Sequence, residues 1–261
     1  MLAAAMRAAA ETGALAQAGV VETVLWPLAN KAMWWRRLHG PEVSLPYTLY
    51  GDTPRYRWPA LNGRLGRGSI VYSFGLGQNA SFEHELMQAC HCTIYGFDPT
   101  PSSAEWIAAQ QFGLSFRFVE MGIADADGEL KFFAPENPDH ISYSIRPGKS
   151  ARLGRSFGTS ATKQGVTAKV RTLPSIMRML KHAKIDMLKM DIEGAEDKVI
   201  DSIVQTTIRP EQFLVEFHHG FYGIGRDDVR RSVQKMSDMG YRIYWVSDRG
   251  LEYAFVHRAF I

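Results

Sequence analysis

From residue 70 onward, short apolar runs alternate with segments that have helical periodicity. Two apolar runs of strand length, Ile70–Phe74 and Thr93–Phe97, flank a segment, Ser81–Ala89, in which Phe82 and Leu86 fall on one helical face. Alternation of this kind is typical of βαβ units, in which a helix connects two parallel strands. The pattern therefore predicts an α/β fold built around a mostly parallel sheet.

The alternation continues toward the C-terminus. Further strands are expected at Phe116–Met121, Glu129–Phe133, Val170–Leu173, Ile185–Asp191 and Gln212–Phe217, and further helices at Ser103–Phe112, Pro174–His182, Gly194–Val204 and Asp227–Met239. The last two apolar runs, Tyr241–Val246 and Leu251–Val256, are separated only by the turn Ser247–Gly250. Because so short a turn joins antiparallel strands, the sheet is predicted to end in an antiparallel hairpin.

Two stretches lack this alternation. Gly40–Gly68 is punctuated by proline and glycine and is interpreted as a connector, so residues 1–68 are predicted to form an N-terminal helical extension and connector, and residues 69–261 one domain. Residues 146–169 are rich in Gly, Ser, Thr and basic side chains and are expected to form a long surface loop. A long loop over a cofactor-binding edge is often a lid.

The N-terminal extension contains an amphipathic segment, Val20–Arg37, which ends in Trp34-Trp35-Arg36-Arg37. Amphipathic rings beside cations are compatible with a helix that rests on a membrane surface, so peripheral membrane contact through residues 1–40 is one interpretation. A helix packed on protein is the other, because Pro27 interrupts the pattern. No window reaches the 18 to 20 apolar residues of a membrane span, so none is expected.

The composition of the chain is that of an ordinary globular protein. The chain has 261 residues, a net charge of +3 and two cysteines, which is ordinary for a globular protein with one large α/β domain. Low cysteine use fits a reducing compartment, and the N-terminus lacks a convincing secretion signal, so a cytoplasmic location is expected.

Basic residues cluster in one part of the chain. Between His140 and Ile185 there is no Asp or Glu, whereas ten Lys and Arg residues fall there. Such a run can attract an acidic or phosphorylated substrate, but part of it has helical spacing and is equally compatible with a solvated face. Nucleic acid is not expected as a partner, because no platform of stacking side chains accompanies the charge.

The most informative motif comes directly after the first strand of the alternating region. Ile70–Phe74 leads into Gly75-Leu76-Gly77, and Asp98 lies 21 residues beyond Gly77, at the end of the next apolar run. A glycine turn at a strand end allows a ligand to approach the backbone, and an acid after the second strand can accept hydrogen bonds from ribose hydroxyls. The spacing predicts a nucleotide-sized cofactor at this edge of the sheet.

Three further acidic positions lie at predicted strand ends. Asp191 follows one strand and is interpreted as a functional residue beside the cofactor, whereas Asp125 either contacts adenine or only builds a turn. Glu216, at the end of another strand, shares a face with His218, and His219 follows. His218 or His219 is the preferred general base, with Asp191 or Glu216 orienting it or coordinating a metal; the sequence leaves open whether a divalent metal such as Mg²⁺ takes part.

Several runs resemble the FkbM-type methyltransferases. The resemblance covers about residues 70–219 and is carried by Val71-Tyr72-Ser73-Phe74-Gly75-Leu76-Gly77, Gly96-Phe97-Asp98-Pro99, Ile123-Ala124-Asp125-Ala126-Asp127-Gly128, Ile185-Asp186-Met187-Leu188-Lys189-Met190-Asp191-Ile192-Glu193-Gly194-Ala195-Glu196 and Leu214-Val215-Glu216-Phe217-His218. It implies a class I methyltransferase-like Rossmann fold and S-adenosyl-L-methionine as the cofactor. It also implies O-methylation of a hydroxyl on a small metabolite or sugar. The residues expected to bind the cofactor are Ser73, Gly75, Gly77, Asp98, Asp125 and Asp191.

Two other functions remain open from the sequence. An NAD-dependent oxidoreductase also uses a glycine turn followed by a strand-end acid, although the predicted terminal hairpin argues against it. A non-catalytic binding protein that retains the fold is the alternative from a different class. The acceptor, the oligomeric state and the roles of the extension and of loop 146–169 are not determined by the sequence.

Overall fold

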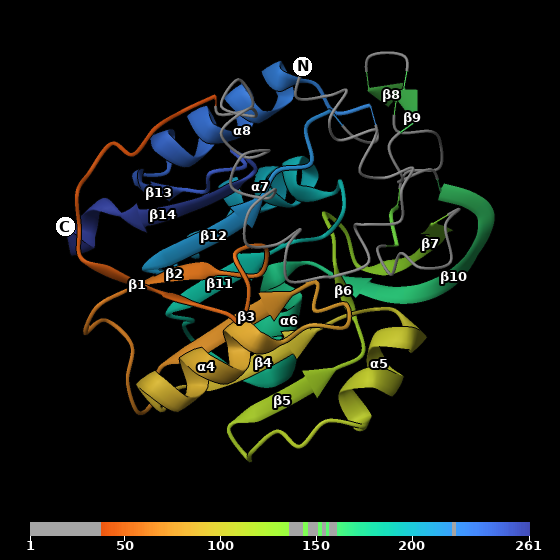
Figure 1. The fold of residues 1–261 in the computed structure, drawn as a ribbon, viewed down its shortest axis with the longest axis horizontal. Helices are drawn as coiled ribbons and strands as arrows, with labels where there is room; N and C mark the ends of the chain where they lie inside the picture. The colour runs from red at the N-terminus through yellow and green to blue at the C-terminus, as the bar shows by residue number, and fades with distance from the viewer. Residues whose placement is uncertain (1–37, 136–142, 146–150, 153–154, 157–160, 221–222) are drawn as a thin grey trace, which may run out of the picture.

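A seven-stranded sheet forms the centre of the described part of the protein (Figure 1). The computed structural model describes residues 38–135, 143–145, 151–152, 155–156, 161–220 and 223–261. The strand order is β13-β14-β12-β11-β3-β4-β5. The strands span Ile70–Phe74 (β3), Thr93–Phe97 (β4), Phe116–Val119 (β5), Met187–Met190 (β11), Gln212–Glu216 (β12), Tyr241–Val246 (β13) and Glu252–His257 (β14).

Only β14 runs against the other strands of this sheet. The pairs from β12 to β5 are all parallel, whereas β14 pairs antiparallel with both β12 and β13. The predicted α/β fold, mostly parallel sheet and antiparallel terminal hairpin are therefore confirmed. The hairpin does not simply extend the sheet: β14 is inserted between β12 and β13, which places Glu252 opposite Glu216.

Helices cover both faces of the sheet. On one face α6 (Leu173–Leu180), α7 (Glu196–Val204) and α8 (Arg226–Asp238) pack on side chains such as Phe74 and Leu188. On the other face α4 (Ser81–Cys90) packs on Val71 and Ile94, while α5 (Pro101–Ala108) lies nearer to β5. Burial of apolar side chains on both faces explains why the central strands consist of nearly continuous hydrophobic runs.

The segment predicted as a connector contains a hairpin. Strands β1 (Tyr47–Tyr50) and β2 (Trp58–Leu61) pair antiparallel, and the backbone N–H of Leu61 donates to Gln212 Oε1 at 2.8 Å. Trp58 and Leu61 are buried with α4 against the sheet. Strands of four residues, one of them containing Pro59, give little periodic signal, which is why the pattern did not reveal them. The domain division at residue 68 stays a prediction.

Part of the predicted surface loop is also a strand. β10 (Ala161–Arg171) pairs antiparallel with β7 (Gly128–Pro135) and parallel with β6 (Gly122–Ile123), so the loop prediction is wrong for residues 161–169. The strand is long and polar in sequence, and its residues 165–171 are partly exposed, so it lacks the apolar run that marks a buried strand. Within the former loop, β8 (Ala151–Arg152) and β9 (Arg155–Ser156) form a short pair.

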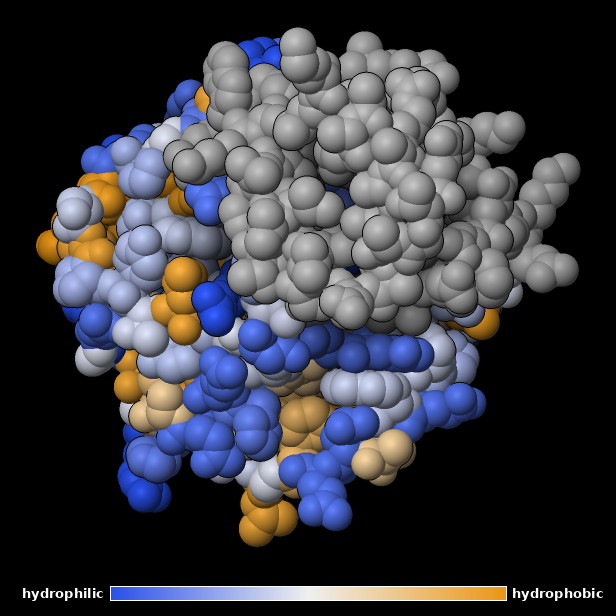
Figure 2. Space-filling model, in the orientation of Figure 1, coloured by the Kyte–Doolittle hydropathy of each residue, from blue (hydrophilic) through white to orange (hydrophobic). Residues whose placement is uncertain are grey.

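Figure 2 shows the hydropathy of one face of the described residues. In the view of Figure 2, hydrophilic side chains cover most of the described face, with single hydrophobic side chains between them. Isolated apolar groups of this kind are normal on a folded protein. None of the described helices combines the length and the apolar character that crossing a membrane requires. The amphipathic segment 20–37 lies outside the described residues, so its two interpretations stay predictions.

Candidate active site

A cavity opens at the carboxyl edge of the sheet, where β3, β4, β11 and β12 end. Its empty volume is ≈ 1220 Å³, part of which is open solvent. The wall includes Gly75–Asn79 after β3, Asp98–Thr100 after β4, Asp191–Glu193 after β11, and Glu216 of β12. Four neighbouring strand ends thus contribute to one concave surface, which is where open α/β sheets bind their ligands.

The glycine turn after β3 is shaped by a close backbone contact. Gly75 has a φ of +80°, and a Cβ atom there would lie 1.6 Å from the carbonyl oxygen of Asp191. No side chain fits in this space, so β3 and β11 approach each other closely only because residue 75 is glycine. Gly77 also has a positive φ, of 55°. The glycines bring the turn against Asp191, and their predicted cofactor contact remains a prediction.

Asp98 fastens the glycine turn to β4. Its Oδ2 accepts hydrogen bonds from the backbone N–H groups of Leu76 at 3.1 Å and Gly77 at 2.9 Å. Its Oδ1 accepts from the backbone N–H of Thr100 at 2.9 Å and from Thr100 Oγ1 at 2.6 Å. A carboxylate has about four acceptor sites, and these four bonds fill them, so contact with a ribose would exchange one of the bonds. Asp98 therefore orders the turn as well as lining the cavity.

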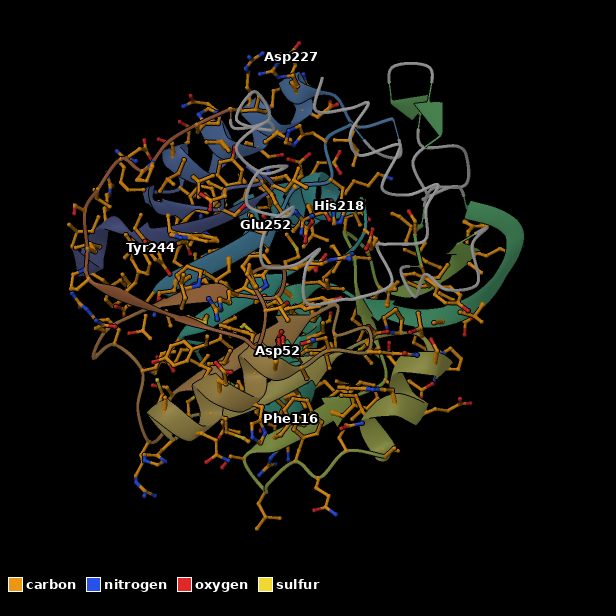
Figure 3. All side chains as sticks on the ribbon, in the orientation of Figure 1. Asp52, Phe116, His218, Asp227, Tyr244 and Glu252 are labelled. Atoms are coloured by element: carbon orange, nitrogen blue, oxygen red, sulfur yellow. The ribbon has the colours of Figure 1, made fainter. Side chains whose placement is uncertain are left out.

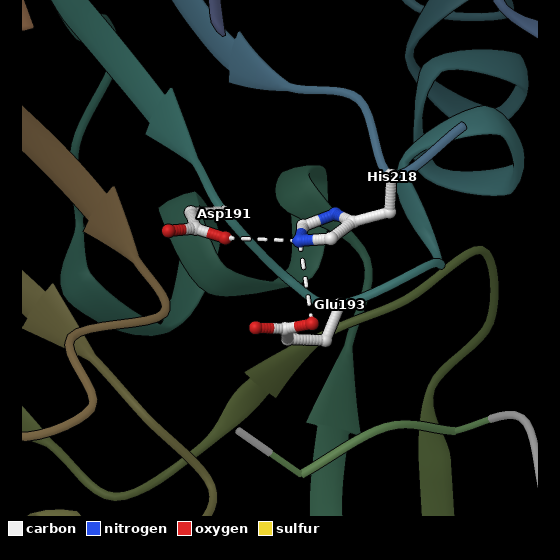
Figure 4. Close-up of side chains that lie close together, drawn as sticks. All are labelled: Asp191, Glu193 and His218. Carbon is white, nitrogen blue, oxygen red and sulfur yellow. Dashed lines mark ion pairs between the residues drawn. The ribbon is translucent and has the colours of Figure 1, made fainter. Parts of the chain in front are cut away.

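Beyond the turn, carboxylates surround a buried histidine (Figure 4). His218 Nε2 lies 3.3 Å from Glu193 Oε2 and 3.7 Å from Asp191 Oδ1. On the other side of the ring, Nδ1 lies 2.7 Å from Glu196 Oε1. Glu216 Oε1 is 3.9 Å from Nε2. The side chain of His218 is 8% exposed, whereas those of Asp191 and Glu193 reach the cavity wall and are 28% and 21% exposed.

The charges of this group decide its protonation. Burial lowers the pKa of His218, but Glu193, Glu196 and Glu216 together raise it well above the ordinary value. The surrounding carboxylates therefore favour the protonated ring, an imidazolium. Burial and the negative charge of Glu216 raise the pKa of Asp191 well above that of a free aspartate. An imidazolium cannot accept another proton, so a neighbouring carboxylate is the better candidate for that role.

Arg249 holds Glu216 in place. The residue lies in the turn between β13 and β14, and its guanidinium contacts Glu216 Oε1 at 2.9 Å and Glu252 Oε1 at 2.8 Å. Burial raises the pKa of Glu216, but Arg249, His218 and two further cations together outweigh this and leave the pKa below its ordinary value. Figure 3 labels Glu252, which lies opposite Glu216 in the pairing of β14 with β12. Glu216 therefore stays ionised beside Asp191.

Glu193 has a backbone conformation that few residues adopt. Its φ is +53°, and its carbonyl oxygen accepts a hydrogen bond from Ser144 Oγ at 2.8 Å. A left-handed conformation at a residue other than glycine is unfavourable and persists where surrounding contacts impose it, often at functional sites. This turn directs the carboxylate of Glu193 toward His218.

A comparison with protein families identifies the family of this chain. The family described as "Methyltransferase FkbM domain" matches residues 70–243, a range that contains the glycine turn, Asp98 and the whole carboxylate–histidine group. The chain belongs to the FkbM methyltransferase family. Membership shows that residues 70–243 form a methyltransferase domain of this family, and no curated protein matches the chain.

Solved structures of methyltransferases are similar only at low identity. The FkbM methyltransferase from Methylobacillus flagellatus KT is 12% identical with a TM-score of 0.43, over 72% of this chain and 43% of that one. The precorrin-6y C5,15-methyltransferase from Geobacter metallireducens GS-15 is 14% identical with a TM-score of 0.33, over 69% and 67%. A chain from the complex between the Haloferax volcanii Trm112 methyltransferase activator and the putative methyltransferase is 9% identical with a TM-score of 0.36. That match covers 74% of this chain and 84% of the other. This chain thus spans less than half of the Methylobacillus protein.

The FkbM domain brings some predicted residues together and leaves others apart. Asp191, Glu216 and His218 converge as expected, but His219, although buried, does not line the cavity. His218 lies between the end of β12 and a turn that begins at His219, so the chain changes direction where the two histidines meet. Asp125 is exposed and also lies outside the cavity wall. Its predicted contact with adenine has no support in this geometry.

Ser73, which the sequence predicts to bind the cofactor, is not exposed to the cavity. It is fully buried beneath the glycine turn, where its Oγ donates to Glu83 Oε1 at 2.5 Å. Ser73 does not itself line the cavity, but Glu83 does. Its placement makes Ser73 a support for Glu83.

Three further charged residues complete the site, and none of them was assigned a role in it from the sequence. Glu193, Arg249 and Lys189 all line the cavity, and only Glu193 was noticed, without an assigned role. The turn Ser247–Gly250 and the polar Lys189 inside an apolar strand were the available signals. A charged residue in a buried strand indicates a paired or functional group.

The donor atoms at the cavity suit a hard metal ion. Carboxylate oxygens of Asp191 and Glu193 and a ring nitrogen of His218 all lie within 4.8 Å of one another. Oxygen-rich sites with one imidazole suit Mg²⁺ or Mn²⁺. These three residues fit a divalent cation, provided that His218 gives up its proton to bind it.

Proposed function

We propose that this FkbM methyltransferase transfers a methyl group from S-adenosyl-L-methionine to a hydroxyl of a small metabolite or sugar. The observation that carries the proposal is the composition of one cavity wall. The glycine turn and Asp98, at β3 and β4, suit the nucleoside of the donor, whereas Asp191, Glu193 and Glu216, at β11 and β12, suit a hydroxyl. Donor and acceptor would therefore meet over β3 and β11.

The reaction needs positioning and the removal of one proton. The acceptor oxygen attacks the methyl carbon, the carbon–sulfur bond breaks, its electron pair stays on sulfur, and the hydroxyl proton leaves. Holding the two reactants in line supplies much of the rate. We propose Asp191 as the proton acceptor, because its carboxylate reaches the cavity while His218 lies behind it and does not line the wall. His218 then positions Asp191 and balances its charge.

A metal-assisted form of the same step uses the same residues. A divalent ion held by Asp191, Glu193 and His218 would lower the pKa of a bound hydroxyl, so that the proton is lost without a strong base. Asp191 would then be a ligand and not the proton acceptor. The two forms therefore differ in their response to chelation of divalent ions.

Calorimetry tests the donor. We expect S-adenosyl-L-methionine and S-adenosylhomocysteine to bind, and NAD⁺ and NADH not to bind, because the family implies this donor. If NADH binds and S-adenosylhomocysteine does not, the result would support the oxidoreductase alternative instead. Binding of the donor without turnover on any acceptor would favour a non-catalytic protein that retains the fold.

A screen with labelled donor tests the acceptor. Matched pairs of neutral and phosphorylated hydroxyl compounds should separate the two acceptor classes that the sequence left open. Preference for the phosphorylated members would support recognition by the basic segment between His140 and Ile185. Equal turnover would assign that segment to an ordinary solvated surface.

Replacement of Asp98 should weaken donor binding. We expect Asp98→Ala to cost about 1–3 kcal/mol of binding free energy, because the ribose loses a hydrogen-bond partner and the turn at Leu76 and Gly77 loses two. Calorimetric titration with S-adenosylhomocysteine measures the effect. Asp125→Ala, at an exposed position outside the cavity, is the control and should bind normally. Unchanged affinity in Asp98→Ala would contradict the ribose assignment.

A further inference from the structure

A second charged group lies in the cavity wall, apart from the carboxylate–histidine group. Lys189 of β11 and Glu83 in the first turn of α4 form an ion pair, with Nζ 3.4 Å from Oε1. Their side chains are only 6% and 2% exposed, yet both line the cavity. The rings of Trp58 and Phe82 lie 5.3 Å and 6.0 Å from Nζ. The pair is therefore enclosed by aromatic side chains and opens only toward the cavity.

The pair keeps unused hydrogen-bonding capacity. An ammonium has three donors, and Lys189 makes no hydrogen bond within the described part of the chain beyond its ion pair with Glu83. Glu83 Oε1 is engaged by Ser73 and Lys189, whereas Oε2 has no partner among the described residues. Desolvation makes buried charges costly unless further hydrogen bonds satisfy them, so an apolar pair would serve packing as well or better. Retention of both charges at a cavity wall indicates a ligand.

The position of the pair along the sheet edge identifies the part of the ligand. Lys189 and Ser73 are register partners on β11 and β3, and two residues further along these strands are Asp191 and Gly75. The pair thus lies directly beneath the contact between the glycine turn and Asp191. If the ribose of the donor binds at Asp98, after β4, the next part of the donor lies over the glycine turn, after β3. Beyond its ribose and sulfur, S-adenosyl-L-methionine carries its amino acid end.

We propose that Glu83 and Lys189 bind the zwitterionic amino acid end of the donor, an assignment that rests on the proposed function. The α-carboxylate would accept hydrogen bonds from Lys189 Nζ, and the α-ammonium would donate to Glu83 Oε2. Charge-assisted hydrogen bonds of this kind are strong where water is excluded. The charges are complementary, because the Lys189 ammonium would face the α-carboxylate and the Glu83 carboxylate would face the α-ammonium.

The test compares two nucleosides that differ in the amino acid end. S-Adenosylhomocysteine carries the zwitterion, whereas 5′-methylthioadenosine lacks it and keeps the adenosine. We expect Lys189→Met and Glu83→Gln each to weaken binding of S-adenosylhomocysteine by roughly 10- to 100-fold, because each removes a charged hydrogen-bond partner. Their affinity for 5′-methylthioadenosine should equal that of the wild type. Lys184→Met makes the same chemical change at a side chain that is 79% exposed, and should alter neither affinity.

Each other outcome overturns the assignment. Equal losses for both nucleosides would make the pair a structural support of the cavity. Unchanged affinity for S-adenosylhomocysteine would show that the pair does not bind the amino acid end, and a raised KM for the acceptor would then assign it to acceptor binding.

A second measurement uses the wild-type protein alone, in case the variants do not fold. S-Adenosyl-L-methionine should bind more tightly than its decarboxylated analogue, and S-adenosylhomocysteine more tightly than its deaminated analogue. Equal affinities within each pair would overturn the inference. Failure of the wild type to bind any of these nucleosides would instead refute the proposed function, so the two failures are distinguishable.

Discussion

Asp191→Asn should reduce turnover by about 10²- to 10⁴-fold, the usual contribution of a positioned acid or base. The amide cannot take the acceptor proton, although it occupies the same place behind the glycine turn. Binding of S-adenosylhomocysteine should change little, because the backbone of Asp191, which contacts Gly75, is unaltered. Methyl transfer from labelled donor measures turnover, and calorimetry measures affinity.

Chelation separates the two forms of the proton step. If Asp191 is the proton acceptor, activity should persist in EDTA, and added Mg²⁺ should have no effect. Loss of activity in EDTA and its return with Mg²⁺ or Mn²⁺ would instead assign Asp191, Glu193 and His218 to a metal. Asp125→Asn is the matched control at an exposed carboxylate. Full turnover in Asp191→Asn would contradict both forms.

Gly75→Ala should be the most destabilising single methyl addition that we propose. Its φ of +80° is unfavourable for alanine, and the new Cβ would meet the carbonyl oxygen of Asp191 at 1.6 Å. Backbone strain and overpacking together are expected to lower the free energy of unfolding by about 2–6 kcal/mol. Chemical denaturation measures the loss, and binding of S-adenosylhomocysteine should fall with it, because the turn must move away from Asp191.

A second glycine isolates the cause of this loss. Gly63 has a φ of +70°, and a Cβ there would have no atom within 4 Å. Gly63→Ala carries only the conformational cost of about 1–2 kcal/mol and leaves the cavity unchanged. If both variants lost the same stability, contact with Asp191 would not be what requires glycine at residue 75.

The local pattern of apolar and polar residues was sufficient to predict most strands of the central sheet. The strands Ile70–Phe74, Thr93–Phe97 and Tyr241–Val246 were predicted with the bounds that the structure shows. Each is a strand-length apolar run bounded by turn residues, so its signal is contained in a few neighbouring positions. The hairpin β1–β2 and most of β10 were missed, whereas the expected strand Glu129–Phe133 lies within β7. The missed strands are either short or polar, and they form only through pairing with neighbouring strands.

The candidate site shows the same division. The glycine turn, Asp98, Asp191, Glu216 and His218 were predictable because each directly follows a recognisable strand, and parallel strands end at one edge. The separation of His218 from His219 depended on where the chain leaves that strand. The proton acceptor could not be chosen from the sequence, since the raised pKa of His218 depends on Glu193 and Glu196 after β11 and on Glu216 of β12, which the fold brings together.

By itself, the sequence determined the α/β class, the family and the strand-end chemistry, because these depend on periodicity and on motifs of a few adjacent residues. Only the tertiary structure decided that β14 enters the sheet beside β12, that Arg249 thereby holds Glu216, and that Lys189 meets Glu83 under Trp58. These contacts join residues 33 to 131 positions apart. Their formation depends on how sheets and helices bury their faces together, and no local pattern of side chains encodes that packing.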